Sequence, residues 1–184
     1  MFFIEDNDFL KPCHKDFFES VVDDDFDFPI YYHPHSTHND ENECLGHVWI
    51  KRAELNNMEE VNNSVYAEQF KLIARSFAEK HGIRIIKFYR GSVNVTVNNG
   101  MEVCPTHQDH DFEHYQMLIY VNDMKDKDSK LIILDDDKKT ILKEVYPDKF
   151  KGLIFDNKPH YHYYPKQGTR WVMVCTFMGV QVSE

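Results

Sequence analysis

Apolar residues follow a helical period just before residue 82 of this 184-residue chain. Four of them recur at i, i+3, i+4 and i+7 and form one stripe: Phe70, Ile73, Ala74 and Phe77. Asn63 or Ser64 can cap the start of such a helix, and Gly82 can follow its end, where a left-handed backbone is needed. We therefore predict a helix over residues 64–81 whose apolar stripe packs against the outside of a β-sheet.

From residue 83 onward the pattern changes to short apolar runs separated by Asn, Gly, Asp, Lys and Pro. We predict strands over 83–90 and 92–98, a strand leading to Asp109, and further strands over 114–122, 130–135, 140–146, 152–156 and 170–177. Many short strands at close spacing after a helix favour a sandwich or jelly roll. The fold class predicted is mostly β with flanking helices.

Residues 1–62 show the least regular pattern. A short helix is predicted after Pro12, ending at the acidic run 23–25, which we interpret as a solvated turn, and a strand is predicted over 45–50. Three histidines, His33, His35 and His38, lie in a polar loop that we interpret as an exposed lid rather than a metal site. No linker separates the regions, so we predict one domain over 1–184, with an N-terminal extension over 1–82 and a β core over 83–184.

Composition narrows the possible partners. The formal net charge is −10, from 21 basic and 31 acidic residues, which makes nucleic acid an unfavourable partner and is interpreted as aiding solubility rather than attracting a basic substrate. The four cysteines form no C-x-x-C pair, which fits a reducing cytosol. Neither a signal peptide nor an apolar run of about 20 residues is found, so we expect no membrane segment and a cytoplasmic location.

Candidate chemistry gathers in two stretches. The first contains His107 and Asp109, whose i, i+2 spacing puts both side chains on one side of an extended strand. The second contains His160 and His162, followed by Arg170. Two imidazoles and one carboxylate on one face of a metal ion leave positions open, which suits ferrous iron that binds a chelating co-substrate and dioxygen. A His-x-Asp pair alone is weak evidence in a chain with 11 histidines and 31 acidic residues.

The order of parts around this pair strengthens the interpretation. The matching segments are H-Q-D at 107–109, M-L-I-Y-V-N-D at 117–123, G-L-I-F-D at 152–156, His160, G-T-R at 168–170 and, near the start, F-P-I-Y-Y at 28–32. The chain thereby resembles the 2-oxoglutarate- and iron(II)-dependent dioxygenases, in particular the prolyl-4-hydroxylase-like branch with its many phage-encoded members. The resemblance covers most of the chain and is strongest after residue 84. It implies a double-stranded β-helix of eight core strands, with helices packed on one sheet.

The resemblance also implies a ligand set. His107 and Asp109 match the metal ligands, and the carboxylate at 109 distinguishes the chain from halogenating relatives, which lack it. His160 is favoured as the distal ligand because it stands ten residues before Arg170, the family's usual distance. His162, eight residues before Arg170, remains the alternative ligand and would otherwise line the cavity or support the neighbouring ligands.

Two further residues match the family's co-substrate site. Arg170 would bind the distal carboxylate of 2-oxoglutarate, because a planar guanidinium pairs with a carboxylate through two hydrogen bonds. Tyr120 stands where relatives place a tyrosine that assists that carboxylate, but a core tyrosine is an equally good interpretation. His110, Asp111 and His114 are interpreted as a solvated loop at the rim.

The implied activity is hydroxylation of an unactivated C–H bond in a peptide or small molecule, with release of succinate and CO2. Fe(II) would be the metal, 2-oxoglutarate and O2 the co-substrates, and ascorbate an auxiliary reductant. If the chain is phage-encoded, the host cytoplasm is the expected location. Two alternatives stay open: a non-redox cupin-type metal-binding module and a catalytically inactive structural protein. Arg170 argues against the first, because a binding module needs no co-substrate clamp.

Overall fold

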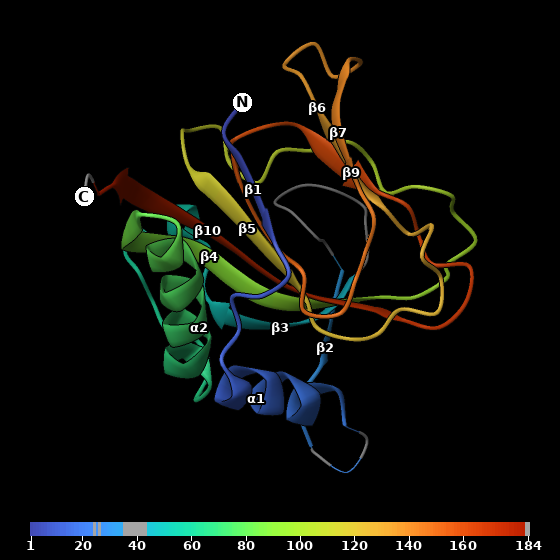
Figure 1. Cartoon of the computed structure of the whole chain (residues 1–184), viewed down its shortest axis with the longest axis horizontal. Helices are drawn as coiled ribbons and strands as arrows, with labels where there is room; N and C mark the ends of the chain where they lie inside the picture. The colour runs from blue at the N-terminus through green and yellow to red at the C-terminus, as the bar shows by residue number, and fades with distance from the viewer. Residues whose placement is uncertain (24, 26, 35–43, 183–184) are drawn as a thin grey trace.

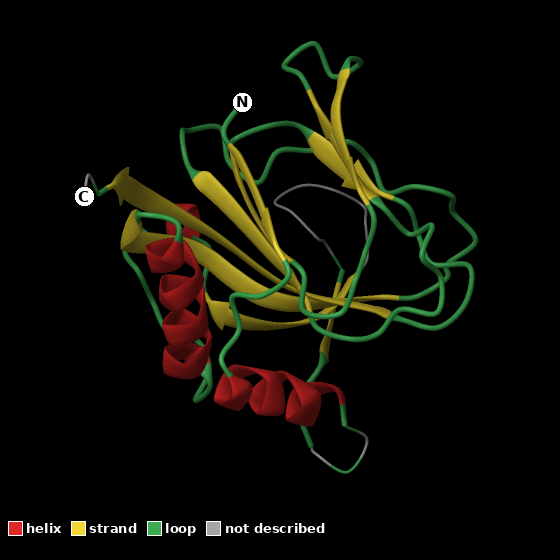
Figure 2. Ribbon diagram, viewed as in Figure 1, coloured by secondary structure: helices red, strands yellow, loops and turns green. Residues whose placement is uncertain are grey.

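The computed structural model describes residues 1–23, 25, 27–34 and 44–182. The predictions for Asp24, His35 and His38 lie outside these residues. In the described part of the chain, ten strands form two antiparallel sheets, and two α-helices and a 3-10 helix flank them (Figures 1 and 2). The predicted fold class, mostly β with flanking helices, is confirmed. Neither described α-helix is long and apolar enough to cross a membrane.

The larger sheet has the order β1, β8, β5, β10, β4, β3, β2. Its strands, in that order, are Phe3–Asp6, Gly152–Asp156, Tyr115–Tyr120, Arg170–Gln181, Ile83–Thr96, Cys44–Ile50 and Tyr31–His33. The smaller sheet has the order β7, β6, β9, with strands Ile141–Val145, Leu131–Leu134 and His160–His162. The helices are α1 (Pro12–Val22), η1 (Ala53–Asn56) and α2 (Ala67–Lys80).

Alternate residues of the central strands supply two separate cores. On β5, Met117 and Ile119 pack with the helices, whereas Leu118 and Tyr120 pack between the two sheets. Because both faces of the larger sheet are covered at its centre, β5 and β8 are apolar at most positions. The core between the sheets ends where polar residues of β4, β9 and β10 replace the apolar ones, and the candidate site lies there.

Several predicted elements have the expected position. The helix after Pro12 ends at Val22, and residues 152–156 form β8 as predicted. The helix predicted over 64–81 begins at Ala67, because Ser64 forms a turn in which its hydroxyl accepts a hydrogen bond from the N–H of Tyr66 at 3.1 Å. Gly82 has φ +68°, the left-handed conformation predicted for it.

The break predicted between residues 90 and 92 is wrong, because β4 runs continuously through Gly91. The glycine is required by packing: a Cβ atom there would lie 2.5 Å from the ring of Trp49, a fully buried side chain of β3. Gly91 therefore marks a close approach between strands rather than a turn.

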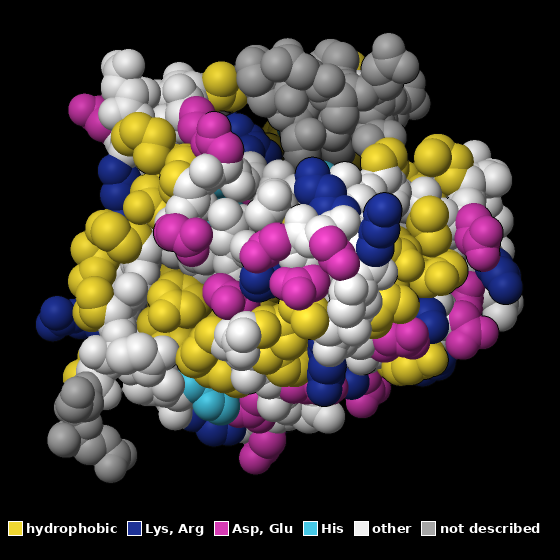
Figure 3. All heavy atoms as spheres, turned by 90° about the horizontal axis from the view of Figure 1, so that it is seen from above, with side chains coloured by type: hydrophobic (Ala, Val, Ile, Leu, Met, Phe, Trp, Pro, Cys, Tyr) yellow, Lys and Arg dark blue, Asp and Glu magenta, His cyan; other side chains and the backbone are white. Residues whose placement is uncertain are grey.

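The first 82 residues contribute more to the sheet than the pattern indicated. The unpredicted strand β1 pairs with β8, so that Phe3 lies opposite Phe155. The unpredicted strand β2 pairs with β3, and His33 lies in β2 opposite Cys44 rather than in an exposed loop. On the face drawn in Figure 3, acidic and basic side chains are interspersed, and the basic ones do not gather in a patch.

Candidate active site

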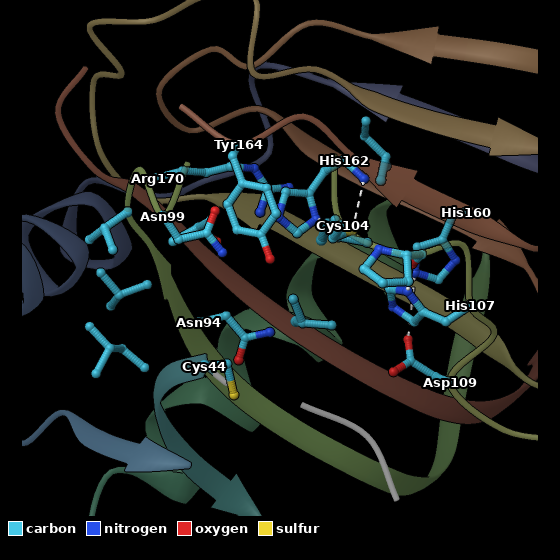
Figure 4. Close-up of a pocket in the computed structure, with 18 of the residues that line it drawn as sticks. Cys44, Asn94, Asn99, Cys104, His107, Asp109, His160, His162, Tyr164 and Arg170 are labelled. Carbon is cyan, nitrogen blue, oxygen red and sulfur yellow. Dashed lines mark hydrogen bonds and ion pairs between the residues drawn. The ribbon is translucent and has the colours of Figure 1, made fainter. Parts of the chain in front are cut away.

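A cavity of about 360 Å³ opens between the larger sheet and β9. Strands β4, β5 and β10 form one wall, and β9 with the segment from Cys104 to Asp109 forms the other (Figure 4). The polar residues that line it include Arg90, Asn94, Asn99, His107, Asp109, Gln116, His160, His162, Tyr164 and Arg170. The cavity is thus lined by every site residue predicted from the sequence except Tyr120, whose ring contacts the Arg170 guanidinium.

His107, Asp109 and His160 lie together at one end of the cavity. Each offers one ligand atom, and these atoms all lie within 4.8 Å of one another. The ring centroids of the two histidines are 4.6 Å apart, and Nε2 of His160 is 3.9 Å from Oδ2 of Asp109. Asp109 and His160 are buried, whereas His107 is partly exposed.

The backbone positions these side chains differently from the prediction. No continuous strand leads to Asp109. A single bridge instead joins His107 to His160, with N–H to O distances of 3.0 and 2.9 Å in the two directions. Pro105 has no N–H to extend a ladder, and the chain leaves the bridge directly after His107. The expectation of an extended strand from His107 to Asp109 was therefore wrong, although both side chains face the cavity.

The two histidines have the same orientation. Nδ1–H of His107 donates to the carbonyl of Pro105, and Nδ1–H of His160 donates to the carbonyl of Lys158, each at 2.9 Å. A carbonyl can only accept, so these contacts specify the tautomer with the lone pair on Nε2. Metal-binding histidines are oriented in this way, with the second nitrogen on a carbonyl or carboxylate.

Asp109 is surrounded by positive charge. Nη1 of Arg90 donates to Oδ1, and Nη1 of Arg52 donates to the Asp109 backbone carbonyl. Burial alone would raise the pKa of Asp109, but Arg90, followed by His160 and His107, lowers it well below its usual range. The carboxylate is therefore ionised, as a metal ligand must be.

The pKa values of His107 and His160 are shifted in opposite directions from the usual value for histidine. Burial lowers the pKa of His107, but a hydrogen bond donated by its ring to Cys104 and the charge of Asp109 outweigh burial and raise that pKa to about 9. Burial and the neighbouring His107 lower the pKa of His160 to about 4. Two imidazoles this close cannot both be protonated at low cost.

Arg170 lies at the start of β10 and is only 3% exposed. Its guanidinium carbon lies 5.4 Å from the ring centroid of Tyr120. Among the described residues, no carboxylate forms an ion pair with Arg170, and neither its Nε nor the Tyr120 hydroxyl has a hydrogen-bond partner. Burial raises the pKa of Tyr120, so its hydroxyl keeps its proton. A buried cation that has no carboxylate partner, beside a buried hydroxyl, fits an anionic ligand.

His162 is the second histidine of β9, and Figure 4 shows it between Arg170 and the group of His107, Asp109 and His160. Its Nδ1 lies 3.1 Å from Sγ of Cys104, and its backbone N–H donates to the same sulfur at 3.2 Å. Burial, followed by the charge of Arg170, lowers the pKa of His162 well below its usual value. Its ligand atoms are not part of the group within 4.8 Å.

The rim residues differ from the prediction of a solvated loop. Asp111 is exposed, but His110 and His114 are only 4% and 7% exposed. Nδ1 of His110 contacts the carboxylate of Glu54, and its Nε2 lies 2.7 Å from Oγ1 of Thr176. These partners come from η1 and β10 and satisfy both ring nitrogens, which allows burial.

The sequence did not predict that Arg90 and Arg52 contact Asp109, or that Cys104 contacts His162. Arg90 offered one usable signal, because it is a charged residue in the middle of β4, within the mostly buried stretch 88–93. Arg52 offered none, since it lies in a connection that only the folded chain brings near Asp109. Cys104 was visible at the head of the motif, but its contact with His162 spans 58 residues.

No family model matches this chain, and no curated protein is similar in sequence. Solved structures are similar in fold. An oxidoreductase of the 2OG-Fe(II) oxygenase family from Burkholderia pseudomallei is 8% identical, with a TM-score of 0.60 over 81% of this chain and 72% of that chain. A prolyl hydroxylase from Trichoplax adhaerens, in complex with a hypoxia inducible factor peptide fragment, is 14% identical. Its TM-score is 0.58 over 96% of this chain and 83% of that chain.

A prolyl-4-hydroxylase from Pseudomonas putida is 11% identical, with a TM-score of 0.58 over 95% of this chain and 91% of that chain. These likenesses define the class of fold. The chain has the double-stranded β-helix of the 2-oxoglutarate–iron(II) oxygenases, prolyl hydroxylases included. The resemblance predicted from H-Q-D at 107–109, His160 and G-T-R at 168–170 is confirmed at the level of fold.

Proposed function

We propose that this protein is a 2-oxoglutarate- and Fe(II)-dependent dioxygenase that hydroxylates an unactivated C–H bond of a peptide or small molecule. One observation carries the proposal. A single cavity joins a group of two histidines and one carboxylate to a buried arginine that has no carboxylate partner among the described residues. A metal site alone requires no such arginine.

The residues present fit an iron site. Nε2 of His107, Nε2 of His160 and Oδ2 of Asp109 would hold the ion, and each is oriented by a hydrogen bond or ion pair of its own. Two imidazoles and one carboxylate are the ligands typical of non-haem Fe(II) oxygenases, in which the remaining positions stay open. When bound, the ion supplies the oxidising chemistry, and the protein supplies orientation and a dry site.

The other end of the cavity fits the distal carboxylate of 2-oxoglutarate. Arg170 would bind it through its guanidinium, and the hydroxyl of Tyr120 would donate to it. Leu118, Leu131 and Val174 add apolar side chains to the lining of the cavity. Apolar surroundings would strengthen the charge-assisted hydrogen bonds at Arg170.

The overall reaction converts 2-oxoglutarate and O2 into succinate and CO2, and the second oxygen atom enters the C–H bond of the primary substrate. That substrate would approach past Asn94, Asn99 and Tyr164, polar residues that line the cavity away from the group of His107, Asp109 and His160 (Figure 4). A peptide stays among the candidates because the fold-related Trichoplax enzyme is seen with a peptide fragment.

The proposal is tested by incubating the protein with Fe(II), ascorbate and 2-oxoglutarate and measuring succinate. We expect succinate to form in the native protein and in an Asp111→Ala control, whose exposed carboxylate lies two residues from the site. Asp109→Ala should form none. Metal binding without succinate, in the presence of candidate peptides and small molecules, would instead favour a non-redox cupin-type module. Failure to bind metal would favour an inactive structural protein.

A further inference from the structure

Nε2 of His162 is a buried polar atom without a visible function. This atom is inaccessible to solvent, and it has no hydrogen-bond partner among the residues that the structure describes. Buried ring nitrogens in native proteins nearly always have a partner, because losing hydration without a replacement hydrogen bond is costly. Unlike the unpartnered ring nitrogens of His14 and Trp49, this atom belongs to a residue that lines the cavity, so a bound ligand can supply the missing partner.

The contact with Cys104 indicates which ring nitrogen carries the proton. Sγ of Cys104 already accepts the backbone N–H of His162, and it lies 3.1 Å from Nδ1. The thiol hydrogen can therefore point to Nδ1, which acts as the acceptor. In that tautomer Nε2 carries the hydrogen, so the unpartnered atom is a donor. A donor requires an acceptor, and a carboxylate oxygen is a strong one.

The position of His162 on β9 indicates which end of a bound ligand this side chain would contact. His160 and His162 project from the same side of the strand, two residues and so roughly 7 Å apart. His160 faces Asp109, with Nε2 3.9 Å from Oδ2, whereas His162 and Arg170 line the same cavity beyond that pair (Figure 4). Figure 4 shows the ring of His162 on the Arg170 side of Cys104.

We propose that His162 donates a hydrogen bond from Nε2 to the distal carboxylate of 2-oxoglutarate, which it shares with Arg170. This inference rests on the proposed function and adds a co-substrate-binding residue to it. The anion would then satisfy three buried donors from three strands: Nε2 of His162 on β9, the guanidinium of Arg170 on β10, and the hydroxyl of Tyr120 on β5.

Three substitutions separate a binding role from a packing role. His162→Phe keeps the ring but removes both nitrogens. His162→Asn keeps an amide near Nδ1, where Cys104 can reach it, but places no donor at the position of Nε2. His162→Gln does the reverse, because its longer side chain puts an amide N–H near Nε2 and leaves Cys104 without that partner.

The measurement is calorimetric titration of the Mn(II)-loaded protein with two probes. 2-Oxoglutarate occupies both ends of the cavity, whereas oxalate binds at the metal and has no distal carboxylate. We expect His162→Phe and His162→Asn to bind 2-oxoglutarate roughly 10- to 100-fold more weakly and to bind oxalate as the native protein does. His162→Gln should recover most of the affinity for 2-oxoglutarate. Thermal unfolding checks that each variant folds. If His162→Phe does not fold, the comparison of His162→Asn with His162→Gln is sufficient to test the proposal.

The outcomes separate this inference from the function on which it rests. If the native protein binds oxalate but not 2-oxoglutarate, the proposed function is wrong, and this inference with it. If the native protein binds 2-oxoglutarate and all three variants bind it equally well, the proposed function stands and the role of His162 is wrong. Equal losses for both probes would place His162 at the metal end and also contradict the inference.

Discussion

Arg90 donates to Oδ1 of Asp109, and this leaves Oδ2 as the carboxylate oxygen that faces Nε2 of His160 at 3.9 Å. The two oxygens of one buried carboxylate are thus assigned different partners. Such an arrangement presents a single oxygen to a metal ion and prevents the carboxylate from rotating. We propose that Arg90 acts on the site through Asp109, as a positioning residue.

Replacement of Arg90 by Met should weaken metal binding by about 10- to 100-fold, the usual effect of removing a side chain that orients a ligand. Mn(II) affinity, measured by calorimetry, checks this. Arg84→Met is the matched control, because Arg84 lies on the same strand but is exposed, and it should bind Mn(II) normally. Tighter Mn(II) binding in Arg90→Met would mean that Arg90 competes with the metal instead.

His160→Ala and His162→Ala should behave differently although they stand two residues apart. Loss of His160 should abolish both metal binding and decarboxylation of 2-oxoglutarate, because its Nε2 lies beside Asp109. Loss of His162 should leave the metal bound and part of the decarboxylation intact. Iron content and succinate are the measurements. Iron retained by His160→Ala and lost by His162→Ala would assign the distal ligand to His162.

Arg170→Ala should weaken 2-oxoglutarate binding about a hundredfold, because a buried carboxylate would lose its charged partner. Metal affinity should not change, since Arg170 lies at the opposite end of the cavity. Arg170→Lys should restore only part of the affinity, because an ammonium cannot form the planar two-bond pair. Unchanged affinity in Arg170→Ala would indicate that another base, such as the exposed Lys166, binds the carboxylate.

Gly91→Ala should destabilise the fold by about 1–3 kcal/mol, the usual range for overpacking a core. The added Cβ would lie 2.5 Å from the Trp49 ring, and Trp49 is fully buried and cannot move aside. Urea unfolding checks this. Combining Gly91→Ala with Trp49→Leu should give less destabilisation than the sum of the two single changes, because the residues are in contact. Additive effects would contradict the proposed clash.

The sequence predicted features that depend on local spacing. The stripe of Phe70, Ile73, Ala74 and Phe77 specified α2, and all four residues are fully buried. The ten-residue distance from His160 to Arg170 was likewise legible, because it lies within one connection between β9 and β10.

Features that depend on distant segments could not be predicted. Nothing near Phe3 shows that it lies opposite Phe155, or that Arg52 reaches the backbone of Asp109. His110 looked solvated because its partners, Glu54 and Thr176, lie 56 and 66 residues away. Polar residues in a loop predict exposure only when no distant partner satisfies them.

The central claim is that the protein uses O2 to decarboxylate 2-oxoglutarate. The atom balance makes this directly measurable. Loss of CO2 leaves three of the five oxygen atoms of 2-oxoglutarate, and succinate has four, so the fourth must come from O2. Fe(II)-loaded protein should therefore be incubated with 2-oxoglutarate under ¹⁸O2 and the succinate examined by mass spectrometry. We predict one ¹⁸O atom per succinate, and no succinate from Asp109→Ala. Unlabelled succinate, or labelled succinate formed equally by Asp109→Ala, would contradict the account.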